Sequence, residues 1–215
     1  MTRALIIMGI ITTILNLFGC SGQTMKNEGG LTKEAKEQLT NSAETFKNRP
    51  IYKELTEKII DTTSDENLLQ VVFDNLSEKL SADYEKDYET VMSWNKSRQA
   101  IYMIWKLEAE VNNGGFNQFY YNSSGQFYKH LPEALRLIGA RKFADLTEKA
   151  NKTFEKEKEK IKKHQDGTIE GFSKSYDDNS LNDFDTEFYD NYKTENLQQI
   201  QVDFIRKNKK EFKDK

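Results

Sequence analysis

The sequence predicts an all-α fold, a single multi-helix domain behind an N-terminal lipoprotein signal peptide. Apolar residues recur at helical i, i+3 and i+4 spacing through most of the chain after residue 30. The 215 residues include only two prolines, Pro50 and Pro132, so long helices are permitted almost everywhere. No run alternates apolar and polar residues for long enough to indicate a sheet. The length is that of one ordinary domain rather than two.

Composition limits the classes of protein to which the chain can belong. Charged residues make up 31% of it and the mean hydropathy is -0.82, which is polar for a globular protein. Aromatic residues nevertheless reach 12%, whereas a disordered chain is poor in them, so we expect a core built largely from rings. The net charge of -3 lacks the basic excess of nucleic-acid-binding proteins. We therefore expect no direct nucleic-acid partner.

The first twenty residues have the order of a bacterial export signal. Arg3 supplies a positive charge, residues 4–18 are mainly apolar, and small residues follow. The apolar run is shorter than the roughly 20 residues that span a bilayer as a helix. Residues 17–20, Leu-Phe-Gly-Cys, resemble the lipobox of bacterial lipoproteins, in which the cysteine thiol carries a diacylglyceryl group. An uncleaved signal anchor and a buried N-terminal helix are the alternatives.

This resemblance predicts the organisation and location of the chain. Residues 1–19 would be the signal peptide, residues 20–30 the lipidated Cys20 and a flexible tether, and residues 31–215 the helical domain. Cys20 is the only cysteine, so no intramolecular disulfide can form. We expect an extracytoplasmic protein of the bacterial cell envelope, with the membrane as a partner through the lipid anchor.

Within the domain, apolar periodicity and helix-end signals define the expected helices, which cover residues 31–47, 51–62, 64–80, 93–111, 116–122, 132–139, 141–164, 181–192 and 195–212. The helix over 93–111 has the clearest stripe, and the Asn and Gly residues at 112–115 should end it. Pro132 suits the start of its helix and Gly139 the end. Residues 81–88 are expected to form a loop or short turn, and residues 166–182 an irregular segment.

A carboxylate on an apolar stripe marks the most unusual stretch. Glu108 lies seven residues after Ile101 and three before Val111, so it should be partly buried and needs partners. We predict that it accepts hydrogen bonds from backbone amides of the turn at 113–116, or from the Asn and Gln side chains there, and locks two helices together. The structural motif then comprises Glu108, Asn112, Asn113, Gly114, Gly115, Phe116, Gln118 and Phe119. Alternatively, Glu108 or Glu110 acts as a general base or metal ligand in a pocket beside Asn112 and Gln118.

Residues 110–119, Glu-Val-Asn-Asn-Gly-Gly-Phe-Asn-Gln-Phe, resemble the signature of the bacterial DNA-mimic protein family. Residues 134–140, Ala-Leu-Arg-Leu-Ile-Gly-Ala, resemble its second landmark, and the likeness covers about residues 50–212. The resemblance implies an all-helical fold. It also implies surface carboxylates that imitate DNA phosphates and occupy the DNA-binding face of a transcription factor.

Two charged segments are candidate interaction surfaces. The acidic one comprises Asp177, Asp178, Asp183, Asp185, Glu187 and Asp190. On a helix Asp183, Glu187 and Asp190 would share one side, which is either a solvated face or a DNA-like surface. Residues 149–163 are rich in lysine with glutamates at i, i+4 spacing, which is typical of a solvated helix. Attraction to anionic lipid headgroups is the alternative for that segment.

The search for catalytic residues predicts none. His130 and His164 lie in unrelated segments, and the chain has no HExxH, no GxSxG and no Walker lysine. We expect no metal and no cofactor. The leading hypothesis is a non-enzymatic, membrane-anchored module that binds another protein, whose identity and oligomeric state the sequence leaves open. The alternatives are a DNA mimic that uses its acidic surface, and a hydrolase-type enzyme that uses Glu108 and Glu110.

Overall fold

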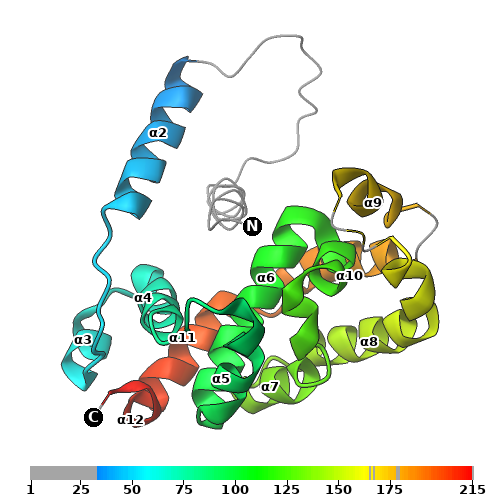
Figure 1. The fold of residues 1–215 in the computed structure, drawn as a ribbon. Helices are drawn as coiled ribbons and strands as arrows, with labels where there is room; N and C mark the ends of the chain where they lie inside the picture. The colour runs from blue at the N-terminus through cyan, green and yellow to red at the C-terminus, as the bar shows by residue number, and fades with distance from the viewer. Residues whose placement is uncertain (1–32, 165, 167, 178–179, 215) are drawn as a thin grey trace. The chain divides into compact units, whose positions relative to one another are not determined.

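The computed structural model describes residues 33–164, 166, 168–177 and 180–214 (Figure 1). Its contacts divide the chain into two units, with the boundary between Pro50 and Ile51. The predicted signal peptide, Cys20 and the tether at 20–30 lie outside the described residues. Among the described residues, no helix combines the length and the apolar character needed to cross a bilayer.

The described residues of the first unit include the helix α2 (Lys33–Lys47), which lies within the expected helix over 31–47. Beyond its end, the Arg49 Nη1 donates to the Phe46 carbonyl oxygen at 2.6 Å. The same guanidinium lies 3.6 Å above the centroid of the Phe46 ring, which is a cation–π contact. Pro50 follows and cannot continue the helix.

The second unit, residues 51–215, is built from helices, and its described residues contain no strand, which confirms the all-α prediction. In chain order its elements are α3 (Glu57–Thr62), α4 (Asp65–Ser77), the short 3-10 helix η1 (Tyr84–Lys86), α5 (Asp87–Ser93), α6 (Lys96–Tyr121), η2 (Ser123–Phe127), α7 (Leu131–Ile138), α8 (Arg141–Lys162), α9 (Ile169–Lys174), η3 (Ser180–Asn182), α10 (Asp183–Tyr192), α11 (Leu197–Lys207) and α12 (Lys209–Phe212).

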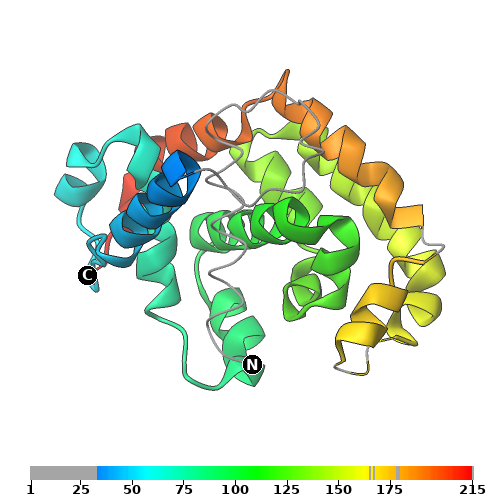
Figure 2. The same ribbon diagram turned by 90° about the horizontal axis from the view of Figure 1, so that it is seen from above.

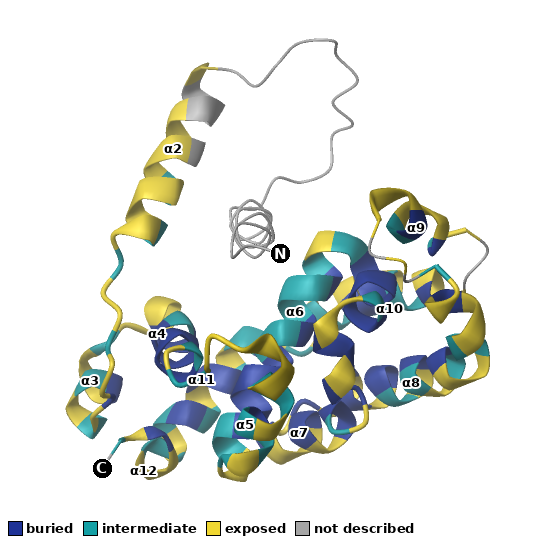
Figure 3. Ribbon diagram, viewed as in Figure 1, coloured by how far each residue is buried: buried dark blue, intermediate teal, exposed yellow. Residues whose placement is uncertain are grey.

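Helix α6 is the central element of the second unit. It contacts α4, α5, α7, α8, α10 and α12. In Figure 2 the green α6 lies between the orange α10 and the turquoise α4, and it contacts both helices. The stripe residues Ile101, Ile104 and Val111 are buried, as predicted, together with Leu107, whereas Trp105 of the same stripe is half-buried. In Figure 3 the ribbon of α6 is mainly dark blue and teal, the colours of buried and half-buried residues. A helix covered on most sides explains why its apolar residues extend beyond one narrow stripe.

Aromatic rings fill the space between α6, α8 and α10. Phe188 of α10 is fully buried and packs edge-to-face on four rings, with centroids 5.8 Å from Phe116, 5.3 Å from Phe143, 5.9 Å from Tyr189 and 5.5 Å from Tyr192. Edge-to-face pairs add stabilisation beyond the area that they bury. The expectation of a core built more from rings than from branched aliphatic residues is nevertheless wrong, because the buried core of the described residues has 11 aromatic side chains and 21 of Leu, Ile or Val.

The predicted helix over 51–62 is wrong in its first half, since α3 begins only at Glu57. The Thr56 hydroxyl accepts a hydrogen bond from the Ile59 amide at 3.2 Å and caps the helix start. Before it, the chain is held by distant residues. The Asn75 side chain donates to the carbonyls of Tyr52 and Lys53, and the Leu55 amide donates to the Asp214 carboxylate at 2.8 Å.

Two short helices lie where loops were expected. Helix α5 replaces the end of the predicted loop at 81–88, and α9 lies inside the predicted irregular segment at 166–182. Thr168 caps α9 by accepting a hydrogen bond from the Gly171 amide at 2.9 Å. Helices of six or seven residues complete fewer than two turns, so their apolar periodicity is too short to recognise in a sequence.

The ends of α7 agree with the sequence. Pro132 lies in its first turn, where its missing amide hydrogen is harmless. Gly139 follows the last residue with φ +96°, the left-handed conformation that a glycine cap adopts without strain.

Candidate functional site: the kinked motif of α6

The motif lies at a kink inside α6. Asn112 and Asn113 remain helical, and the backbone then leaves the helical conformation at Gly114 and Gly115 before the helix resumes. Gly115 has φ +71° and ψ -176°, a region that a residue with a Cβ adopts only with strain. The predicted break is therefore present, two residues later than the first Asn.

An acidic residue of α10 occupies the kink. The Phe116 amide donates to Asp185 Oδ1 at 2.8 Å. A Cβ placed on Gly115 would lie 2.2 Å from Asp185 Oδ2, so only a glycine leaves room for this carboxylate. Burial raises the pKa of Asp185, and the hydrogen bond from Phe116 opposes that rise. The prediction that Glu108 accepts from the turn amides is wrong, because Asp185 is the carboxylate that does so.

Glu108 instead joins α6 to α10 and α11. The Tyr192 hydroxyl donates to its Oε1 at 2.5 Å, and the Gln201 side-chain amide donates to its Oε2 at 2.7 Å. Gln201 is fully buried. Burial raises the pKa of Glu108, and the two hydrogen bonds oppose that rise. The expectation that Glu108 is partly buried and partnered is confirmed, although its partners differ from those predicted.

Glu110 bridges the kink to the segment that follows it. Its Oε2 accepts from Gln118 and Asn122, each at 2.8 Å, and its Oε1 accepts from the Ser124 hydroxyl at 2.7 Å. The Gln118 Oε1 in turn accepts from the Asn113 side chain at 3.0 Å. The polar motif residues thus bind one another across the break.

Tyrosine hydroxyls satisfy the backbone carbonyls that the kink releases. The Tyr176 hydroxyl donates to the Gly114 carbonyl at 2.6 Å, and the Tyr189 hydroxyl donates to the Val111 carbonyl at 3.2 Å. A buried carbonyl without a partner would be costly, so these contacts stabilise the bent backbone. We call the kink, its three carboxylates and these tyrosines the α6 lock, comprising Glu108, Glu110, Val111, Gly114, Gly115, Phe116, Gln118, Tyr176, Asp185, Tyr189, Tyr192 and Gln201.

The two phenylalanines of the motif serve packing, whereas its two asparagines lie outside the core. Phe116 and Phe119 are buried in the core, whereas Asn112 is half-buried and Asn113 exposed. Glu108 and Glu110, the pair on which the hydrolase alternative depends, bind different sets of side chains. The structure therefore brings together the predicted motif, but as a helix junction.

The predicted acidic surface is divided among several roles. Asp185 points inward to the kink, Glu187 pairs with Lys149 at 3.0 Å, and Asp190 pairs with Lys193 at 2.7 Å. Asp177 and Asp183 are exposed, and Asp178 lies outside the described residues. The inward side of α10 is as expected, since Phe188 is buried and Phe184 half-buried.

Residues 54–89 form another acidic segment, which was not predicted as a candidate interaction surface. Between residues 54 and 89 the chain has eleven acidic residues and three lysines. Some of the eleven pair with the C-terminal helices, as Asp65 does with Arg206 and Asp61 with Lys209. Others are exposed, namely Glu54, Glu66, Glu78, Glu85 and Glu89. Counting the charges of each segment of the sequence separately reveals this excess of acidic residues.

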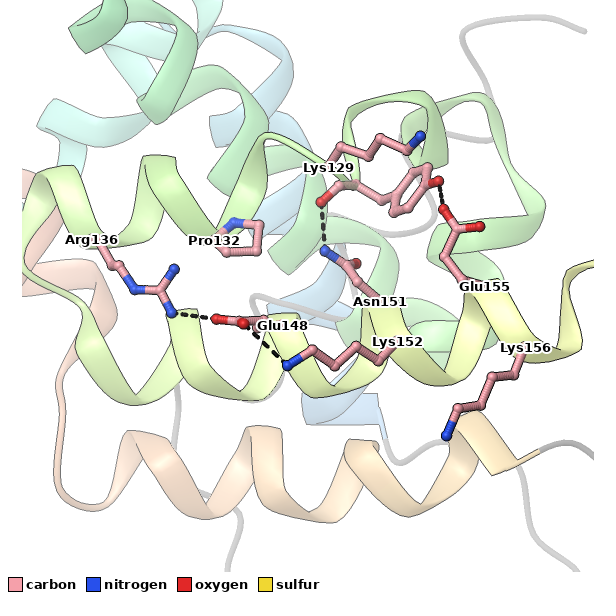
Figure 4. A pocket seen from close by; sticks show the side chains of 9 residues that line it. Lys129, Pro132, Arg136, Glu148, Asn151, Lys152, Glu155 and Lys156 are labelled. Carbon is pink, nitrogen blue, oxygen red and sulfur yellow. Dashed lines mark hydrogen bonds and ion pairs between the residues drawn. The ribbon is translucent and has the colours of Figure 1, made fainter.

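Two hollows lie away from the α6 lock. The larger, about 580 Å³ and open, lies between α7 and α8 and is lined by Tyr128, Lys129, Pro132, Arg136, Glu148, Asn151, Lys152, Glu155 and Lys156 (Figure 4). Both of its carboxylates are already bound: Glu148 pairs with Arg136 and Lys152, and Glu155 accepts from Tyr128. The smaller, about 210 Å³, is lined by Lys96, Gln99, Met103, His130, Glu133, Ala134 and Leu137.

His130, at the smaller hollow, is hydrogen-bonded to the Tyr88 hydroxyl, with 2.9 Å between Nε2 and the oxygen. The described residues contain no group of three or more His, Cys, Asp or Glu side chains that could hold a metal ion. Neither hollow is lined by a carboxylate of the α6 lock.

The sequence comparison identifies the family. The model of the DMP19-like protein family matches residues 92–208, which is more than half of the chain. The chain belongs to this family. No curated protein and no solved structure matches it.

The DMP19-like match begins at the end of α5 and runs to the residue after α11, a narrower range than the predicted 50–212. It contains α6 and every side chain of the α6 lock. The DMP19-like region is thus the part of the chain in which the kink is formed and held.

Proposed function

We propose that this DMP19-like protein is a non-enzymatic interaction module, held to the outside of a bacterial membrane by a lipidated Cys20, and that it acts by binding another protein. The observation that carries the proposal is the α6 lock. Its carboxylates accept hydrogen bonds from a backbone amide, the Tyr192 hydroxyl and side-chain amides of the same unit, so they stabilise a fold. Activity is then left to the outer surface of the helices.

The basic, apolar and small-residue order of residues 1–20 supports the location. A thiol at that boundary is the acceptor of the diacylglyceryl group in the lipoproteins that the segment resembles. Two or more acyl chains hold a protein stably at a bilayer, whereas one chain binds marginally. The motif at 110–119 is then the sequence signature of a shared helix junction rather than of a shared active site.

A pull-down tests the interaction module. Residues 21–215, without the lipid, are immobilised and exposed to solubilised envelope extract, and the captured protein is purified and tested for saturable binding. We expect a partner that free bait displaces. The matched control is E110Q, which keeps the shape of the side chain and one acceptor oxygen, and it should capture the same partner to a similar extent.

The opposite pattern would favour the hydrolase. If the unmodified chain turned over a small molecule and E110Q or E108Q abolished the turnover without unfolding the protein, the carboxylates would be catalytic. The module proposal would then fail.

DNA mimicry is the second candidate, and membership of the DMP19-like family favours it. Its surface would comprise the exposed acidic residues at 54–89 together with Asp177 and Asp183. The partner would be a basic DNA-binding protein that duplex DNA displaces, with affinity that falls steeply as salt rises. A partner without these two properties would contradict the mimic.

A further inference from the structure

Helix α8 carries a row of lysines along its outer side. Six exposed lysines, which we call the lysine face, are Lys142, Lys149, Lys152, Lys156, Lys160 and Lys163. Their spacings of seven, three, four, four and three residues keep them on one side of a helix. The opposite side of α8 is buried in the core through Phe143, Leu146, Ala150, Phe154 and Ile161.

The neighbouring carboxylates compensate only part of this charge. Asp145 shares the face but is bound to Arg136, and Glu148 is shared between Arg136 and Lys152. Lys149 pairs with Glu187. Lys156 has no carboxylate partner among the described residues, and it also lines the larger hollow. Residues 129–163 contain eleven basic and six acidic residues, an excess of positive charge in a chain that is negative as a whole.

The type of residue indicates the type of partner. Lysine is a point charge on a flexible stem, whereas arginine forms the planar fork that suits bidentate recognition of a fixed group. The row itself consists of lysines, and the adjoining hollow adds Arg136 and the ring of Tyr128. From Lys142 to Lys163 the row extends about 32 Å, at about 1.5 Å per residue. Such a row matches a broad, laterally mobile layer of phosphates.

We propose that the lysine face lies against the anionic phospholipid headgroups of the membrane. This inference rests on the proposed lipid anchor, which would keep the second unit near a bilayer and raise the effective concentration of headgroups. Each lysine close to an anionic membrane strengthens binding about five-fold. The larger hollow, bordered by Lys152 and Lys156 of the face and by Lys129, gives a headgroup room to enter beside the row.

Vesicle binding tests the proposal without the lipid anchor. Residues 21–215, which retain every described residue up to 214, are sedimented with vesicles of phosphatidylglycerol and phosphatidylcholine in roughly equal parts. The test variant is K152Q/K156Q/K160Q/K163Q. The control is K53Q/K58Q/K207Q/K210Q, which changes the net charge equally at exposed lysines outside α8. Circular dichroism confirms that both variants are folded.

We expect the test variant to bind at least about 20-fold more weakly than the unmodified chain, and the control to lose less than about three-fold. Binding should also fall at about 0.5 M salt, where charges are screened. Equal losses in the two variants, equal binding to pure phosphatidylcholine, or tighter binding to duplex DNA than to the vesicles would overturn the proposal. Because no acyl chain is present, these results are independent of whether Cys20 is lipidated.

Discussion

Replacement of Gly115 by alanine is expected to lower the free energy of unfolding by about 3 kcal/mol or more. A residue with a Cβ at φ +71° and ψ -176°, a region that almost only glycine adopts, costs about 1–3 kcal/mol. The new Cβ would also lie 2.2 Å from Asp185 Oδ2, so the carboxylate must move and its hydrogen bond to the Phe116 amide is lost. A hydrogen bond to a charged group contributes about 1.5–3 kcal/mol. Urea unfolding measures the change.

Gly139→Ala is the matched control for this prediction. Gly139 also has a positive φ, of 96°, but a Cβ there would meet nothing within 4 Å. The free energy of unfolding of the Gly139→Ala variant should therefore fall only by the backbone strain, about 1 kcal/mol. In a D185A background the loss from G115A should shrink, because the clash and the hydrogen bond are already absent. Equal losses at the two glycines would contradict the role given to Asp185.

Replacement of Glu108 by alanine should cost about 3 kcal/mol, because the Tyr192 hydroxyl and the buried Gln201 amide would both lose their acceptor. Glu108→Gln should be much milder. Its carbonyl oxygen can accept from Tyr192. The Gln201 Oε1, which has no hydrogen-bond partner in the described part of the chain, can accept from the new amide if the Gln201 side chain rotates.

The pH dependence distinguishes E108Q from the unmodified chain. Burial raises the folded-state pKa of Glu108 above its ordinary value of 4.5. The stability that this carboxyl contributes is therefore fully present below pH 4.5 and is lost as the pH rises through the folded-state pKa. The free energy of unfolding of the unmodified chain should fall relative to that of E108Q across this window.

Urea unfolding of both proteins between about pH 4 and pH 8 checks the result. The contributions of Asp185 and Asp214 are the same in both proteins and cancel in the comparison. The pKa of Asp185 is raised and acts in the same direction as that of Glu108. The pKa of Asp214 is lowered on balance, although burial, its largest single influence, raises it. A difference between the two proteins that stays constant with pH would contradict a buried, ionisable Glu108.

Local sequence patterns predicted the longer helices of this protein and the break in α6, because those depend on neighbouring residues. The stripe through Ile101 and Val111 identified α6, and the paired glycines identified its break. The apolar position of Glu108 also indicated that it needed partners. These conclusions required only helical periodicity and the conformational freedom of glycine.

The partners themselves could not be predicted, since they are distant in the chain. Tyr192 and Gln201 follow Glu108 by 84 and 93 residues, and Asp185 follows Phe116 by 69. The run of acidic residues placed Asp185 in the candidate acidic surface with its neighbours. Only the packing of α10 against α6 turns it to the Phe116 amide. Residues 51–56 fail for the same reason, because Leu55 is bound to Asp214, 159 residues away.

Metabolic labelling with a palmitate analogue, combined with cell fractionation, tests the central claim that this protein acts at a membrane outside the cytoplasm. The unmodified chain should be labelled, lack residues 1–19 and sediment with the envelope, whereas Cys20→Ala should be unlabelled. Recovery of the unmodified chain from the cytosol, unlabelled and with Met1 in place, would contradict the account.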